Sequence, residues 1–325
     1  MRSIGEYFDL TDGIQRNAKL IKNLPCNETH STMPEHATNK ATPDAATRLR
    51  TYKDAVVIIT GGASGIGRAL AEELSKRGAR AVVLVDRQVV LAEEVAGGSR
   101  KNGTEAKVYE VDVRDFTEVQ RVVNETVESY GHLDLIFNNA GLSVGAPLEE
   151  IGVDGFNYVL DVNIRGVTNG VQAAYPIMKR QGFGHIVNTA SIAGLMATGE
   201  GFVANGTSKY AIVGLSVNLR IEAARHGVNV SVFCPGVIDT PILKGGGKYG
   251  KDKANIPDEE LDKFFAKYHP MDPKLFATEA LGLVAKNKEI IIVPGRPWKM
   301  MWFATRLSPS LGLWLGSKTI RWSWY

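Results

Sequence analysis

The stretch VVIITGGASGIGRALAEEL, residues Val56–Leu74, decides the fold. Val56–Thr60 is a run of apolar and β-branched residues without polar alternation, which is typical of a strand buried on both faces. Gly61, Gly65 and Gly67 follow, and an amphipathic helical pattern comes after them. This order of strand, glycine-rich turn and helix predicts a βα unit whose turn can approach a phosphate group closely.

The same alternation continues along the chain. Six further apolar runs are separated by helical patterns such as 67–77 and 116–130. The runs are AVVLVD (81–86), AKVYEVD (106–112), LDLIFNNA (133–140), GHIVNTAS (184–191), VNVSVFCPG (228–236) and EIIIVPG (289–295). Strands that alternate with helices in this way form a parallel sheet with helices on both faces. We therefore predict one doubly wound α/β domain over residues 53–295.

Two segments of different composition flank this domain. Residues 1–52 are polar and weakly periodic, and we expect an N-terminal extension, partly helical near 12–23 and otherwise loosely ordered. Residues 296–325 contain all five tryptophans, several basic residues and no acidic residue. Such a tail suits contact with a membrane surface. It equally suits a substrate lid, a subunit interface, or packing onto its own domain.

Composition excludes several classes of protein. The 325 residues are 44% apolar, which is enough for one large core, and the net charge of +3 is too small to indicate a nucleic-acid partner. Cys26 and Cys234 lie far apart and form no Cys/His cluster, so we expect no disulfide framework, no metal site and a reducing compartment. We find no secretory signal pattern and no spanning segment, which predicts a cytoplasmic protein with the tail as its candidate membrane contact.

The glycine turn is a candidate dinucleotide site. A helix that begins near Ile66 directs its first N–H groups toward a pyrophosphate. Asp86 ends the next run, nineteen positions after Gly67. A carboxylate at that place accepts both ribose hydroxyls of NAD and repels a 2′-phosphate. Arg87 follows and softens this discrimination, and we predict NAD in preference to NADP.

Further motifs follow in a recognisable order and spacing. They are TGGASGIG (60–67), VDV (111–113), NNAG (138–141), IVNTAS (186–191) and PGVIDTP (235–241). With these motifs, residues 53–295 resemble the short-chain dehydrogenase/reductase family. The resemblance implies a Rossmann-type fold, NAD(P)-dependent hydride transfer between an alcohol and a ketone, and a homo-oligomer.

The resemblance also implies a role for each matching residue. The implied cofactor-binding residues are Gly61, Ser64, Gly65, Ile66, Gly67, Asp86, Arg87, Asp112, Val113, Asn139, Ala140, Gly141, Lys209, Pro235, Gly236, Val237 and Thr240. Ser191 would hydrogen-bond the substrate oxygen, and Asn163 would hold a water in a proton relay. Lys209 would bind the nicotinamide ribose and lower the pKa of a catalytic tyrosine.

That tyrosine is missing from this sequence. The family pattern is YxxxK, and the residue four positions before Lys209 is Asn205. Ser191 lies 14 positions before Asn205, close to the usual spacing, which argues against a register slip. An asparagine amide can donate a hydrogen bond to a carbonyl, but it has no proton that titrates near neutrality. Tyr210 is a poor replacement for the missing tyrosine, because it follows Lys209 by one residue and therefore points about 100° away from it around the helix. Glu200 lies in a glycine-rich loop on the substrate side, but its carboxylate is more simply explained as a solvated charge than as a catalytic group.

Four interpretations of Asn205 stay open. The protein is an oxidoreductase in which Lys209, Asn163 and water supply the proton, or it reduces a substrate that needs no tyrosine, such as an iminium. Otherwise it is a non-catalytic NAD-binding scaffold, or Asn205 is a substitution introduced to trap a substrate. Because Ser191, Asn163 and Lys209 are all present, we favour an oxidoreductase with an altered proton path and an apolar substrate of moderate size.

Overall fold

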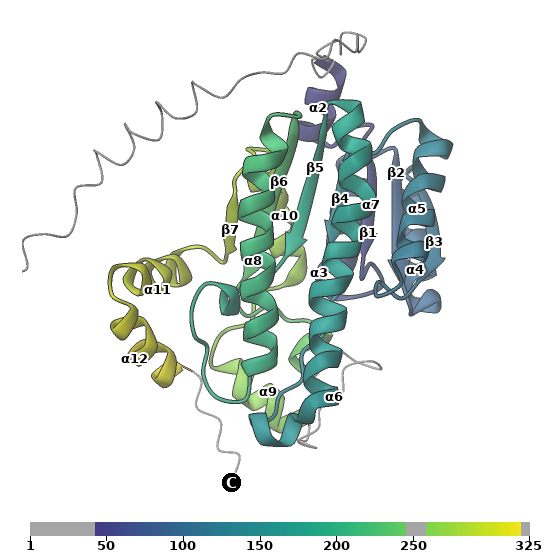
Figure 1. Ribbon diagram of the computed structural model, residues 1–325. Helices are drawn as coiled ribbons and strands as arrows, with labels where there is room; N and C mark the ends of the chain where they lie inside the picture. The colour runs from purple at the N-terminus through teal and green to yellow at the C-terminus, as the bar shows by residue number, and fades with distance from the viewer. Residues whose placement is uncertain (1–42, 245–257, 320–325) are drawn as a thin grey trace, which may run out of the picture. The chain divides into compact units, whose positions relative to one another are not determined.

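Seven parallel strands form one sheet at the centre of the domain (Figure 1), in the order β3-β2-β1-β4-β5-β6-β7. The computed structural model describes residues 43–244 and 258–319. The strands are β1 (Val56–Thr60), β2 (Ala81–Asp86), β3 (Glu105–Glu110), β4 (Leu135–Asn138), β5 (Gly184–Thr189), β6 (Val228–Pro235) and β7 (Ile290–Val293). The strand order reverses between β1 and β4, and ligands bind at the carboxyl ends of strands beside such a reversal. The predicted doubly wound α/β fold is confirmed.

Helices cover both faces of this sheet (Figure 1). The α-helices of the described residues are α2 (Pro43–Thr51), α3 (Gly65–Lys76), α4 (Val89–Lys101), α5 (Phe116–Tyr130), α6 (Leu148–Leu160), α7 (Gly166–Gln181), α8 (Val203–Ala224), α9 (Asp258–Ala266), α10 (Pro273–Val284), α11 (Arg296–Leu307) and α12 (Pro309–Thr319). A π-helical turn, Asp161–Arg165, joins α6 to α7, and 3-10 turns lie at Ile192–Gly194 and Pro241–Lys244. Among the helices of the described ranges, none has both the length and the hydropathy that crossing a bilayer requires.

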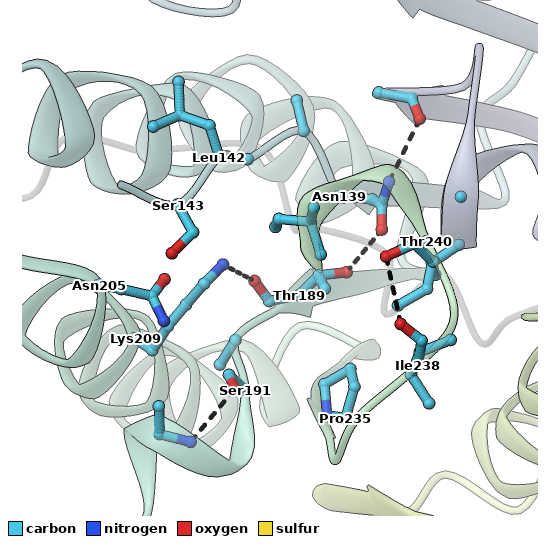
Figure 2. Close-up of a pocket in the computed structure, with 18 of the residues that line it drawn as sticks. Asn139, Leu142, Ser143, Thr189, Ser191, Asn205, Lys209, Pro235, Ile238 and Thr240 are labelled. Carbon is cyan, nitrogen blue, oxygen red and sulfur yellow. Dashed lines mark hydrogen bonds between the residues drawn. The ribbon is translucent and has the colours of Figure 1, made fainter. Parts of the chain in front are cut away.

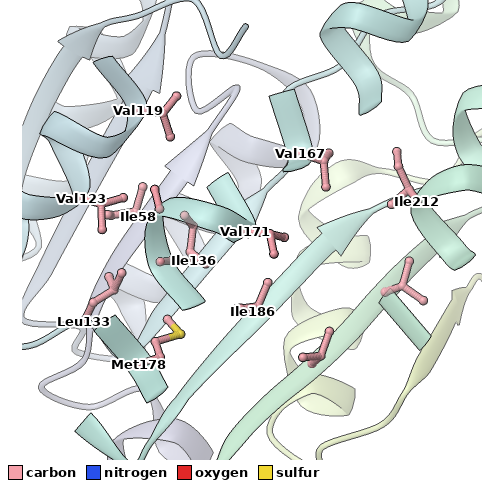
Figure 3. Close-up of a cluster of buried hydrophobic side chains, with 14 of the residues drawn as sticks. Ile58, Val119, Val123, Leu133, Ile136, Val167, Val171, Met178, Ile186 and Ile212 are labelled. Carbon is pink, nitrogen blue, oxygen red and sulfur yellow. The ribbon is translucent and has the colours of Figure 1, made fainter. Parts of the chain in front are cut away.

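One hydrophobic cluster lies on each face of the sheet. Side chains of α5, α7 and α8 pack on one face, where Ile58 of β1 and Val171 of α7 belong to one cluster (Figure 3). Side chains of α3, α4 and α10 pack on the other face, where Ile59 shares a cluster with Phe276. Successive strand residues point to opposite faces, so a strand covered on both sides needs an unbroken apolar run. This explains why the strands could be located from the sequence.

Helix α2 lies within residues that the composition assigned to a loosely ordered extension. Arg48 Nε donates to Asp134 Oδ1 at 2.8 Å, and Asp134 Oδ2 accepts the backbone N–H of Val56 at 2.9 Å. Tyr52 is fully buried and its hydroxyl donates to the carbonyl of Leu281. Residues 43–52 therefore pack with the domain. The helix expected near 12–23 lies outside the described residues.

The ion pair between Arg48 and Asp134 makes a stability prediction. The two side chains are 10% and 0% exposed. Asp134→Asn is expected to lower the free energy of unfolding by about 3–5 kcal/mol, because it removes the buried carboxylate charge that Arg48 faces at 2.8 Å. Chemical denaturation followed by circular dichroism measures the change.

The matched control removes an ion pair from the surface. Arg100 and Glu93 are joined at 3.0 Å, with both side chains 48% exposed. Glu93→Gln should change the unfolding free energy by about 1 kcal/mol or less. An effect of Asp134→Asn as small as that of Glu93→Gln would show that the buried ion pair contributes little to the stability of the domain.

Candidate active site

The glycine-rich turn lies between β1 and α3, at the carboxyl edge of the sheet. Gly61 and Gly65 adopt φ values of 67° and 53°, in the left-handed region that favours glycine. A Cβ at Gly67 would collide with the carbonyl oxygen of Gly61, so glycine lets the helix start pack directly on the turn. Ser64 precedes α3, and its side chain makes no capping hydrogen bond to any described residue. The first N–H groups of α3 therefore stay available to an anion, and the turn fits a pyrophosphate.

Asp86 ends β2 beside this turn. Its Oδ2 accepts the backbone N–H of Ala63 at 3.0 Å, and its Oδ1 accepts the backbone N–H of Gln88 at 2.9 Å. The half-buried carboxylate is thus fixed by two backbone donors. It lies where the ribose of a dinucleotide would sit if its pyrophosphate contacts the glycine turn.

Asp112, one strand further along, is surrounded by positive charge. Arg114 Nη2 donates to Asp112 Oδ2 at 2.7 Å, and its Nε donates to Asp112 Oδ1 at 3.0 Å. These hydrogen bonds lower the pKa of the Asp112 carboxyl. Arg87 Nη1 lies 3.5 Å from Asp112 Oδ2. The charge of Arg87 is therefore partly balanced by a carboxylate other than Asp86.

Asn139 lines the pocket and joins the ends of three strands (Figure 2). Its backbone N–H donates to Thr60 Oγ1 at 2.9 Å, and its side-chain Nδ2 donates to the Thr60 carbonyl at 3.2 Å. On the other side its Oδ1 accepts the Thr189 hydroxyl at 3.3 Å. The amide therefore links the β1–α3 turn to β5 and keeps the two halves of the pocket in register.

Lys209 is a buried cation in this pocket. It lies one turn inside α8 and is 5% exposed. Its Nζ donates to the carbonyl of Thr189 at 3.1 Å. Burial lowers the pKa of this amine to about 8, since desolvation disfavours the charged form. An amine with such a pKa can both give and take a proton near neutral pH.

Ser191 and Asn205 line the same pocket as Lys209 (Figure 2). Ser191 follows β5, and its Oγ accepts the backbone N–H of Ala193 at 3.1 Å. Its own O–H can still be donated to a substrate oxygen. Asn205 lies in the first turn of α8, four residues before Lys209 and therefore on the same helix face. Figure 2 shows Ser143 beside Asn205 and Lys209, and no motif in the sequence pointed to it.

Asn163 lies behind the pocket wall. It is fully buried in the π-helical turn. Its Oδ1 accepts the N–H of Leu142 at 2.9 Å. Its Nδ2 donates to the Leu142 carbonyl and to Ser208 Oγ, both at 3.0 Å. These bonds join the loop after β4 to α8. The side-chain oxygen and nitrogen of Asn163 thus already bond to protein groups. The water relay predicted at Asn163 stays a prediction.

Most of the residues predicted to form the site line this one pocket. They are Gly61, Ser64, Gly65, Ile66, Asp86, Arg87, Asp112, Val113, Asn139, Ala140, Gly141, Ser191, Asn205, Lys209, Pro235, Gly236, Val237 and Thr240. Gly67 and Asn163 are not part of the lining: Gly67 packs against Gly61 in the turn, and Asn163 bonds to Leu142 behind the wall. Tyr210 is 50% exposed and lies outside the lining, in agreement with its expected direction on the helix.

The sequence did not predict several apolar residues of the pocket wall. Trp298 and Met301 come from α11, and the indole of Trp298 lies directly against Gly236. Tyr158 comes from α6 and Phe265 from α9. A lid was one of the alternatives for the tail, but no spacing in the sequence could show which tryptophan reaches the pocket.

The chain belongs to the short-chain dehydrogenase family, since residues 55–248, more than half of its length, match the family model "short chain dehydrogenase". It is similar to levodione reductase of Leifsonia aquatica, with 36% identity over 212 residues, which cover 64% of this chain and 77% of the relative.

Two solved structures share the fold at 27% sequence identity. A short-chain dehydrogenase/reductase from Burkholderia phymatum in complex with NAD has a TM-score of 0.71, covering 84% of this chain and 99% of that one. An alcohol dehydrogenase from the archaeon Thermococcus sibiricus, complexed with 5-hydroxy-NADP, has a TM-score of 0.61, covering 74% and 94%. The family therefore supports a nicotinamide cofactor. The choice between NAD and NADP depends on this chain's own residues.

Proposed function

We propose that the protein transfers a hydride between NAD(H) and an alcohol or ketone, with Lys209 as its proton donor and acceptor. One observation carries this proposal. The buried amine of Lys209 and the hydroxyl of Ser191 share a pocket with the glycine turn and Asp86. Membership of an oxidoreductase family supports the hydride chemistry.

Each polar side chain of the pocket has its own role in the proposed reaction. A bound nicotinamide would supply or accept the hydride. Ser191 donates its O–H, and Asn205 its Nδ2–H, to the substrate oxygen, and together they polarise the carbonyl. In reduction, protonated Lys209 passes a proton from Nζ to that oxygen, directly or through a water molecule. In oxidation, the neutral amine takes the proton back.

The cofactor preference follows from Asp86. We expect NADH to bind more tightly than NADPH, because the fixed carboxylate accepts ribose hydroxyls and repels a 2′-phosphate. Asp86→Ser should shift the ratio of the two dissociation constants toward NADPH by roughly tenfold or more. Fluorescence titration with both cofactors measures this ratio.

A neighbouring carboxylate provides the control. Glu110 ends β3 in register with Asp86 and is exposed. Glu110→Ser removes the same charge from outside the pocket, so it should leave the ratio almost unchanged. Equal affinity of the original protein for NADH and NADPH would contradict the proposed role of Asp86.

The part of the pocket beyond the nucleotide end is largely apolar. Its lining includes Met196, Phe202, Leu243, Phe265, Trp298 and Met301. Among the described residues that line this part, few polar groups can satisfy a strongly polar molecule, and burying unsatisfied polar groups is unfavourable. We therefore propose an apolar substrate of moderate size.

Turnover tests the function directly. The full-length protein is mixed with NADH and a panel of levodione, apolar ketones, diketones and cyclic imines, and NADH consumption is followed by absorbance. Reduction of a ketone supports the proposal. Turnover of imines alone would remove the need for a proton donor to oxygen, and NADH binding without any turnover would identify a scaffold.

A further inference from the structure

Residues 296–319 form a helical hairpin, α11 and α12, beyond β7 (Figure 1). Trp298, Met301 and Trp302 lie on one face of α11 and pack against the hydrophobic core. Their spacing of three and four residues is that of one helix face. The inner side of α11 is therefore covered by its packing on the domain.

Two glycines fix α12 to its neighbours. Gly312 is buried against Thr305 of α11, and a Cβ there would lie 2.5 Å from the threonine Cγ2. Gly316 is buried against the backbone of Ala197, and a Cβ there would lie 2.6 Å from the carbonyl oxygen. Ala197 itself lines the pocket. The hairpin is thus attached both to the core and to the loop at the pocket.

The hairpin also exposes large apolar side chains to solvent, and together we call these the outer surface. On α11 these are Met300 (74% exposed), Phe303 (64%) and Leu307 (72%), and on α12 they are Leu311 (42%), Leu313 (66%) and Trp314 (57%). Six of the fifteen exposed large apolar side chains of the described residues therefore lie within this one hairpin. Such a concentration marks an interaction site.

The charge of this segment selects the kind of partner. Arg296, Lys299 and Arg306 are exposed on α11, and no aspartate or glutamate follows Glu289 in the sequence. A symmetric dimer through this surface would bring like charges together, with no acidic residue of the segment to balance them. An anionic surface with an apolar interior matches both the cations and the exposed apolar groups.

We propose that the outer surface docks onto an anionic lipid bilayer. Its apolar side chains enter the boundary between headgroups and acyl chains, and its cations lie at the lipid phosphates. Because the inner side of the same hairpin carries Trp298 in the pocket wall, docking holds the pocket next to the lipid. The docking does not depend on the reaction proposed above.

Vesicle flotation of the full-length protein tests the proposal. We expect the protein to float with phosphatidylcholine vesicles that contain phosphatidylserine, to float much less with phosphatidylcholine alone, and to be released by high salt. The triple variant Met300→Ser, Phe303→Ser, Trp314→Ser should bind anionic vesicles on the order of 100-fold more weakly.

A matched triple variant controls for lost surface hydrophobicity. Val153, Ile221 and Leu275 are 75%, 79% and 59% exposed on other helices, and serine at all three positions should leave vesicle binding unchanged. Thermal unfolding verifies that both variants are folded. Absence of binding by the original protein, or equal binding by both variants, overturns the proposal. A fall in particle mass in the outer-surface variant alone, measured by light scattering, would instead identify a second copy as the partner.

Discussion

Asn205→Tyr is expected to raise kcat/KM for ketone reduction by about 10²-fold, the lower end of the usual contribution of a positioned general acid, because Lys209 already supplies a proton in the asparagine protein. A tyrosine at this position would lie one helical turn from Lys209 and face the same pocket as Ser191. The buried ammonium of Lys209 would lower the pKa of the new hydroxyl and stabilise its anion. Steady-state rates with NADH and the best ketone of the panel measure the gain.

Asn205→Phe is the control for this substitution. It adds a similar ring to the pocket but no hydroxyl, so it should give no increase in kcat/KM. An equal gain with phenylalanine would attribute the effect to the shape of the pocket. No gain with tyrosine would show that proton transfer is already efficient in the asparagine protein.

Lys209→Met is expected to reduce kcat/KM about 10²–10⁴-fold and to remove its pH dependence. The ordinary pKa of this amine is 10.5, and burial lowers it to about 8 in the folded protein. Reduction needs the protonated amine, so kcat/KM should be level below about pH 8 and fall about tenfold per pH unit above it. Oxidation needs the neutral amine and should show the opposite trend. Initial rates across this pH range, in both directions, measure the profile.

Stability measurements separate this catalytic effect from misfolding. Because the pKa of Lys209 is lower in the folded than in the unfolded chain, the buried charge destabilises the fold below about pH 8, and this cost disappears as the pH rises toward 10.5. Methionine removes the charge and should therefore not destabilise the protein at neutral pH. If the methionine variant keeps the original pH profile, another group supplies the proton.

The sheet and the nucleotide end of the pocket could be predicted from the sequence because their signals are local. Most strands are short segments rich in apolar and β-branched residues, and Gly61, Gly65 and Gly67 follow one of these segments directly. Asp86 ends the next run, so its position at the same edge follows from the topology. The residue pattern within each short segment was enough to predict the strands, the glycine turn and the position of Asp86.

Features that depend on distant partners could not be predicted. Arg48 gains its buried position from Asp134, which is 86 residues away, and the polar composition around it suggested loose order. Trp298 reaches the pocket because α11 packs on the core, which no spacing in the tail reveals. The side-chain bonds of Asn163 likewise became visible only in three dimensions.

The C-terminal hairpin has a consequence for how this lineage can change its chemistry over evolutionary time. Helices α11 and α12 follow β7, which ends at Val293, and their exposed sides can change without altering the strands or the glycine turn. The match to the family model ends at residue 248, whereas Trp298 and Met301 help to enclose the pocket. New preferences at the apolar end of the pocket can therefore arise by substitution in α11, while the glycine turn and Asp86 stay unchanged.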